Sequence, residues 1–233
     1  MKYDGEKDYK HSSSENLGIL ITNLGTPEKP TKKKIRSFLK EFLSDPRVIE
    51  VPKFIWQIIL RLIILNLRPQ KVAKLYKSIW KKEGSPLLVM LEKQKKGIIR
   101  ILKNKKIKIK IEIGMRYGNP NIKLGLEKLR KQKCRRILIL PLYPQYCAAT
   151  TGSTFDEVTE VLRKWRWIPE VRFINNYKKI KIISYNKFDQ LNKKLQKIKV
   201  DVVVHCATHY TKYYTYNDIS KLAKSNIIFG NII

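Results

Sequence analysis

Two histidines near the carboxyl end of the sequence, His205 and His209, are the residues best suited to metal chemistry. A neutral imidazole binds a borderline metal ion or accepts a proton near neutral pH. His205 directly follows the apolar run 200–204, and His209 begins the segment HYTKYY. Site residues of α/β folds lie beyond the ends of strands, which favours His209, with His205 as the second choice. The alternative is that neither histidine binds a metal and both are polar surface residues.

A second group of candidate residues follows other apolar runs of the sequence. It mixes aromatic and apolar side chains with a few hydrogen-bonding groups: Leu24, Arg116, Tyr117, Tyr143 and Tyr146. This mixture suits a pocket for a large, flat, apolar ligand better than a phosphate site. Nucleotide binding has no local support, because neither GxGxxG nor GxxxxGK[ST] occurs. Ordinary turn and core-edge residues remain the alternative.

The candidate residues lie among strands and helices that are predicted to alternate along the sequence. Strands are predicted over 17–23, 107–115, 136–140, 171–174 and 200–204. A first helix is predicted from a cap at Thr31 to about Phe42, because Pro46 prevents it from continuing. Further helices are predicted over 54–67, 71–80, 86–102, 122–129, 154–165 and 180–198. Such alternation is typical of a doubly wound α/β fold with parallel sheets. The segments that follow the strands are therefore expected to meet at one edge.

The charge balance has two explanations. The 233 residues carry a formal net charge of +31 with 43% hydrophobic residues, which is enough for a core and excludes wholesale disorder. Such charge suits a nucleic-acid or anionic-membrane binder. However, the chain has 38 Lys, 31 Ile and only 5 Ala, the pattern of an AT-rich genome. Lys106, Lys108 and Lys110 alternate with isoleucines and predict one solvated strand face, so a basic nucleic-acid-binding protein is the weaker hypothesis.

Several features bear on location. Residues 1–16 are polar, predict a disordered leader and lack the apolar core of a signal peptide. The three cysteines, Cys134, Cys147 and Cys206, lack metal-type spacing, which predicts a reducing, cytoplasmic location and no iron–sulfur centre. The apolar run 54–67 is too short to span a bilayer. It predicts a buried helix, or a helix at a membrane interface or pocket mouth.

Five stretches of the sequence carry a family resemblance. They are GILITNLGTPEKPT (18–31), FLKEFLSDPRVIEVP (38–52), LRPQKVAKLYKSIWKKEGSPLLV (67–89), GMRYGNP (114–120) and LPLYPQYCAATTGSTFDEV (140–158). These stretches resemble ferrochelatase, most closely its enterobacterial type, and the resemblance continues to about Asp201. The YPQY…TTGS core is the most specific part.

The resemblance implies a fold, an activity and site residues. The fold would be chelatase-like, with two similar α/β lobes around a porphyrin cleft: a first lobe at 17–160 and an incomplete second lobe at 161–233. The activity would be that of a lyase that inserts ferrous iron into protoporphyrin IX, with no cofactor beyond substrate Fe²⁺. The run 54–67 matches the family's lip helix, in peripheral contact with a membrane surface. The implied porphyrin-binding residues are Leu24, Arg116, Tyr117, Tyr146 and Ser153, and the implied catalytic and metal residue is His209.

The sequence departs from the family pattern after the predicted strand 200–204. HCATHYTKYY stands where the family has HGIP or HSLP, and the tail from about 205 is divergent. The family's downstream Glu is absent, so the chain is expected to be C-terminally truncated and its activity impaired. An inactive remnant of a ferrochelatase is therefore an alternative. A frameshift near His209 would explain both departures.

Overall fold

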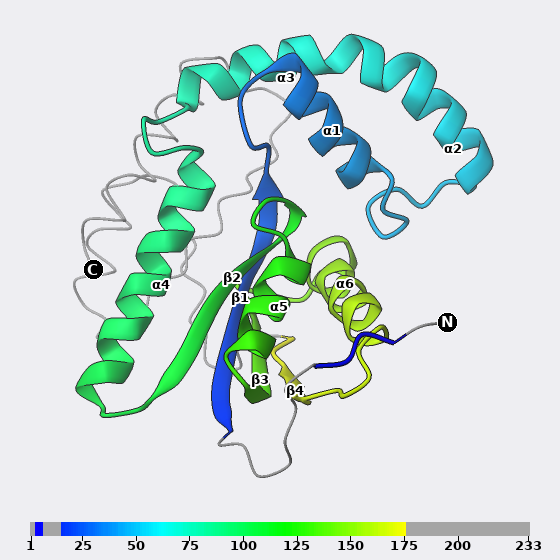
Figure 1. The fold of residues 1–233 in the computed structure, drawn as a ribbon. Coiled ribbons are helices and arrows are strands. Elements are labelled where there is room, and N and C mark those ends of the chain that lie inside the picture. Colours follow the sequence, from blue (N-terminus) through cyan, green and yellow to red (C-terminus); the bar gives the residue numbers. More distant parts are fainter. Residues whose placement is uncertain (1–2, 7–14, 176–233) are drawn as a thin grey trace. The chain divides into compact units, whose positions relative to one another are not determined.

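The structure, a computed structural model, describes residues 3–6 and 15–175 (Figure 1). Apart from residues 143–145, these residues belong to one compact unit. The predicted helix 180–198, the predicted strand 200–204 and both candidate histidines lie outside the described residues.

Four parallel strands form the sheet of this unit. They are β1 (Asn16–Thr26), β2 (Ile109–Gly118), β3 (Cys134–Pro141) and β4 (Glu170–Phe173), in the order β2-β1-β3-β4. This confirms the predicted α/β fold. The chain moves from β1 outward to β2 and then back across to β3, so the winding direction switches beside β1. Ligands of doubly wound sheets bind at this switch point, beyond the carboxyl ends of the strands.

Helices cover both faces of the sheet. Figure 1 shows α4 (Pro86–Asn104) on one side of it, and α5 (Ile122–Lys131) and α6 (Ser153–Leu162) on the other. A π-helical turn, η2 (Ala148–Gly152), leads directly into α6. The core under α5 and α6 is apolar and includes Leu20, Leu126, Leu129, Ile139, Val158 and Leu162. Burial of these side chains against the sheet is the main source of the unit's stability.

Helix α1 (Lys32–Leu43) follows β1 and leads to the segment that contains Asp45. The Thr31 hydroxyl accepts a hydrogen bond from the Lys34 N–H, as an N-cap should. Ile35 and Leu39 face inward at helical spacing. The helix ends at Leu43, before Pro46, as predicted. This ending leaves the residues just after α1 in an irregular segment, in which the Arg47 backbone N–H donates to the Asp45 side chain.

One long helix replaces two predicted ones. The chain runs without a break through α2 (Lys53–Ile59), a π-helical segment η1 (Leu60–Ile64) and α3 (Leu65–Ile79), so the prediction of separate helices over 54–67 and 71–80 is wrong. Pro69 lies inside α3 and has no N–H to offer the carbonyl of Leu65. That carbonyl accepts a hydrogen bond from the Arg36 guanidinium instead. The tolerated proline could not be foreseen from the local pattern.

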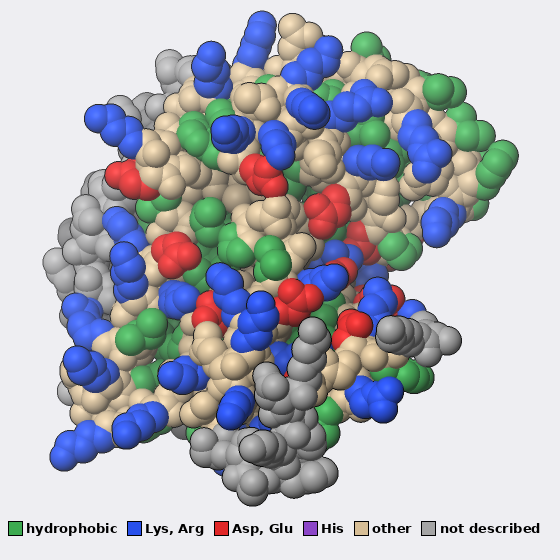
Figure 2. Space-filling model, viewed as in Figure 1, with side chains coloured by type: hydrophobic (Ala, Val, Ile, Leu, Met, Phe, Trp, Pro, Cys, Tyr) green, Lys and Arg blue, Asp and Glu red, His purple; other side chains and the backbone are tan. Residues whose placement is uncertain are grey.

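The predicted solvated lysine face is present only in part. Lys110 of β2 is exposed while Ile111 and Ile113 are buried, but Lys106 and Lys108 precede the strand, and Ile107 is exposed as well. Figure 2 shows lysine and arginine side chains scattered over the visible described surface rather than gathered in one patch. This distribution on the visible face gives a nucleic-acid interface no specific support.

The predicted boundary between residues 160 and 161 falls inside α6. Beyond it, β4 pairs in parallel with β3, with Ile137 opposite Val171 and Ile139 opposite Phe173. The compact unit accordingly continues to Asn175. Residues up to Asn175 therefore contain the complete four-stranded sheet and the helices that cover it.

Of the predicted leader, residues 3–6 lie against the amino edge of the sheet, and Asn16 already belongs to β1. Asp4 forms a parallel bridge with Trp165. The Glu6 carboxylate accepts hydrogen bonds of 2.6 and 2.8 Å from the Arg135 guanidinium, and Arg130 lies 3.5 Å away. We call residues 3–6 the N-terminal clamp, because they join the start of β3 to the end of α6.

Glu6→Gln is expected to lower the free energy of unfolding at neutral pH by about 2 kcal/mol, the scale of a hydrogen bond to a charged group. Hydrogen bonds from Arg135 lower the pKa of Glu6 from 4.5. Its contribution is therefore present above about pH 4.5 and is lost as the pH falls through the lowered pKa. Urea unfolding followed by tryptophan fluorescence measures it. The matched control is Glu15→Gln at an exposed position; equal losses in both variants would contradict the role of the clamp.

Candidate functional site

A buried polar cluster lies at the carboxyl edge of the sheet. Arg116 and Tyr117 come from the end of β2, Ser153 is the first residue of α6, and Asp45 lies just after α1. Three segments far apart in the sequence therefore meet at one point, beside the switch point of the winding. We call these four residues the Asp45 network.

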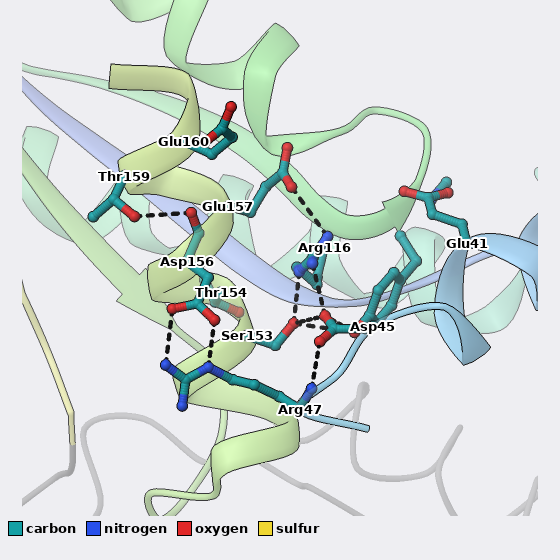
Figure 3. Close-up of polar contacts among 12 residues, drawn as sticks. Glu41, Asp45, Arg47, Arg116, Ser153, Thr154, Asp156, Glu157, Thr159 and Glu160 are labelled. Carbon is teal, nitrogen blue, oxygen red and sulfur yellow. Dashed lines mark hydrogen bonds and ion pairs between the residues drawn. The ribbon is translucent and has the colours of Figure 1, made fainter. Parts of the chain in front are cut away.

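The Asp45 carboxylate is the centre of the network (Figure 3). Its Oδ2 accepts hydrogen bonds from Arg116 Nη2 at 2.7 Å, from the Tyr117 hydroxyl at 2.7 Å and from the Ser153 hydroxyl at 2.5 Å. Its Oδ1 accepts the Arg47 backbone N–H at 2.8 Å. Arg116 Nε donates to Ser153 Oγ at 2.6 Å. Every polar side-chain group of the Asp45 network thus has a partner within it.

Burial and charge fix the protonation states of the network. The Asp45 side chain is only 3% exposed. Burial alone would raise its pKa, but hydrogen bonds from Ser153, Tyr117 and the Arg47 N–H, with the charge of Arg116, lower the pKa below 3.8. Burial also raises the pKa of the Tyr117 phenol. At neutral pH the network therefore holds one carboxylate, one guanidinium and a neutral phenol.

These protonation states limit what the network can do chemically. Asp45 is too acidic and Tyr117 too weakly acidic to exchange protons near neutral pH. The network is instead a rigid support, because its side chains are hydrogen-bonded to one another. A reaction that removes protons from a substrate would need a base from elsewhere in the protein.

Further contacts fasten the network to its surroundings. Arg116 Nη1 lies 3.2 Å from a Glu157 carboxylate oxygen on α6. The Arg116 guanidinium lies over the Tyr117 ring at 4.6 Å from its centroid, and Phe42 of α1 meets the same ring edge-on at 5.1 Å. Arg116 is therefore held between two carboxylates and an aromatic face, which fixes its orientation.

The sequence-predicted porphyrin-binding residues divide into two groups. Arg116, Tyr117 and Ser153 are brought together, and the last two are fully buried with their hydroxyls engaged by Asp45. Leu24, by contrast, is half-buried at the end of β1, and Tyr146 is 52% exposed. Contact of any of these residues with a porphyrin stays a prediction. The first three hold the edge of the site in place, and the other two present surface that a ligand can reach.

Sequence reasoning missed the acidic members of the site. Asp45 and Glu157 were given no role, although both lie in stretches that carry the family resemblance, SDPR and FDEV. The one signal in the sequence was the position of Asp45, a charged residue directly before Pro46 at a predicted helix end. Among residues 3–6 and 15–175, no group of three or more His, Cys, Asp or Glu side chains could hold a metal ion. The metal-binding prediction, His209 or His205, falls outside those residues.

The sequence of this chain matches one known protein family. A family model described as Ferrochelatase matches residues 16–209, which includes the Asp45 network and both candidate histidines. The chain belongs to the ferrochelatase family. The recognition made from the motifs is thereby confirmed.

Curated ferrochelatases give the same result. That of Thioalkalivibrio sulfidiphilus is 54% identical over 178 residues, which are 76% of this chain and 48% of its own length. That of Nitrosococcus oceani is 48% identical over 177 residues, again 76% of this chain and 48% of its own length. The chain thus spans about half the length of the curated ferrochelatases it matches.

Proposed function

We propose that this protein acts as a ferrochelatase, a lyase that inserts ferrous iron into protoporphyrin IX to form protoheme. The family match over residues 16–209 carries the proposal. It is supported by the way the family motifs RY and TTGS meet: Arg116, Tyr117 and Ser153 share one carboxylate, that of Asp45. Residues from unrelated parts of a sequence converge in this manner where a site must be held rigid.

The proposed reaction removes two pyrrole N–H protons as Fe²⁺ enters the ring, so its charge balances. Bending the macrocycle exposes the nitrogen lone pairs, a strain that binding of the rest of the ring offsets. The Asp45 network offers no base near neutral pH. We therefore assign the proton-accepting and metal-guiding role to the imidazole of His209, with His205 as the second choice.

We further propose that the apolar outer face of the long helix contacts a membrane surface, a source of the greasy substrate. Among its strongly exposed side chains are Phe54, Leu62 and Leu67, at 78, 68 and 68% exposure. Lys53 and Arg61 flank them, as suits anionic lipid. Searched over the described residues, the structure contains no helix long and apolar enough to cross a membrane. The free thiols of Cys134 and Cys147 favour a reducing compartment such as the cytoplasm.

The test is metallation of a porphyrin by the purified chain. With Zn²⁺ or, without oxygen, Fe²⁺, the metalloporphyrin absorption bands are expected to grow with time. His209→Ala should slow this growth by about 100-fold, the scale of a lost general base, whereas the third histidine of the chain gives the control His11→Ala. Equal rates in wild type and His209→Ala would remove His209 from the site. Absence of the bands in wild type would favour an inactive ferrochelatase relative.

A further inference from the structure

Two side-chain donors converge above Gly152, the last residue of η2. A Cβ built on Gly152 would lie 3.0 Å from Arg47 Nη1 and 3.1 Å from the Tyr146 hydroxyl. The two donors are therefore at most 6.1 Å apart, with the empty Cβ position of a glycine between them. A carboxylate, whose two oxygens accept several hydrogen bonds, matches such a pair.

Arg47 is held so that one of its nitrogens stays available. Its Nε and Nη2 both donate to the Asp156 carboxylate, Nη2 at 2.9 Å. Figure 3 shows the third nitrogen of the guanidinium directed away from Asp156. Within the described part of the chain, neither Arg47 Nη1 nor the Tyr146 hydroxyl has a hydrogen-bond partner. The Asp156 ion pair thus orients the guanidinium and leaves Nη1 as the nitrogen that can bind a ligand.

Both donors are accessible. The Arg47 side chain is 37% exposed and Tyr146 is 52% exposed, whereas Gly152 itself is buried. Arg47 also follows Asp45 by two residues, and its backbone N–H donates a hydrogen bond to the Asp45 carboxylate. The donor pair is therefore a surface-facing neighbour of the rigid support at the carboxyl edge.

We propose that Arg47 and Tyr146 bind a carboxylate side chain of the tetrapyrrole, one of its propionates. The inference rests on the proposed function and names a contact that orients the ring. Arg47 supplies the charge, Tyr146 a second hydrogen bond, and Gly152 the space that the carboxylate group fills. Arg47 lies in the segment after α1 and is oriented by Asp156 of α6, so the charged side of the site is in place before the ligand binds.

The experiment compares binding of protoporphyrin IX with binding of its dimethyl ester, which lacks the charge, by quenching of tryptophan fluorescence in detergent. Wild type is expected to bind the free acid at least tenfold more tightly than the ester. Tyr146→Phe and Arg47→Gln should each lower that preference by about tenfold or more. Gly152→Ala should do the same, because its methyl group fills the site. Its backbone angles, φ −63° and ψ −46°, are helical, so alanine introduces no backbone strain, and the close contacts of its Cβ are with side-chain atoms of Arg47 and Tyr146.

Matched controls are Tyr3→Phe and Arg100→Gln, on exposed side chains away from the donor pair, and both should keep the wild-type preference. Equal affinity of wild type for acid and ester would overturn the carboxylate site and leave porphyrin binding intact. Unchanged preference in Gly152→Ala and Tyr146→Phe would also overturn it. If wild type binds neither form, the proposed function fails, and this site fails with it.

Discussion

Asp45→Ala is expected to lower the free energy of unfolding by about 3–5 kcal/mol, the cost of leaving a buried charge without its partner. Four donors lose their acceptor at once: Arg116, Tyr117, Ser153 and the Arg47 N–H. Glu157 alone cannot replace it, because it lies 3.2 Å from a different nitrogen of Arg116. Urea unfolding at neutral pH gives the value directly.

The matched control is Glu50→Ala, an exposed carboxylate five residues away, which should change stability by less than about 0.5 kcal/mol. The pH dependence adds a second readout. Since the folded pKa of Asp45 lies below 3.8, its contribution is present above that pH and disappears as the pH falls further. Wild type should therefore lose more stability on acidification than Asp45→Ala. Parallel acid profiles would show that the carboxylate is not the centre of the network.

Gly25→Ala is expected to destabilise the protein by more than about 4 kcal/mol, a value reserved for severe backbone conflicts. Gly25 has φ +116°, which side-chain-bearing residues rarely adopt. Its added Cβ would lie 1.8 Å from the Tyr117 carbonyl oxygen in the neighbouring strand. Since that oxygen is backbone, the pairing of β1 with β2 must open beside the Asp45 network. Thermal unfolding by circular dichroism measures the loss.

Gly97 provides the opposite result for the same chemical change. It lies inside α4, and an added Cβ would meet nothing within 4 Å. Gly97→Ala should therefore stabilise the protein by about 0.5–1 kcal/mol, the helix-propensity difference between the two residues. If both alanine variants shift stability in the same direction, the conflict assigned to Gly25 is wrong.

The sheet was predictable because its signals are local. The apolar runs before Gly25 and Pro141 and the alternating run that includes Ile111 each identified a strand, and the turn residues placed their ends within a few residues. The long helix was not predictable from the sequence. Its Leu65 carbonyl, which Pro69 leaves without an N–H partner, accepts a hydrogen bond from Arg36, which lies far away in the sequence. Tertiary partners of this kind leave no local pattern.

The candidate site divides in the same way. Arg116, Tyr117 and Ser153 were found through motifs, but their common partner Asp45 was not. No spacing rule joins residues that are 71 and 108 positions away from Asp45. The sequence did predict that the segments after the strands meet at one edge of the sheet. Only the fold shows that a single carboxylate connects the motifs there.

The N-terminal clamp also has a consequence for the order in which a nascent chain folds. Asp4 is synthesised about 160 residues before its partner Trp165, which corresponds to roughly 8–30 s at ordinary rates of synthesis. Strand β1 waits as well, since its neighbours β2 and β3 follow after long crossovers. The N-terminal clamp, although made well before its partners, is thus among the last segments to reach its final position, and the unit completes its folding only once β4 has emerged.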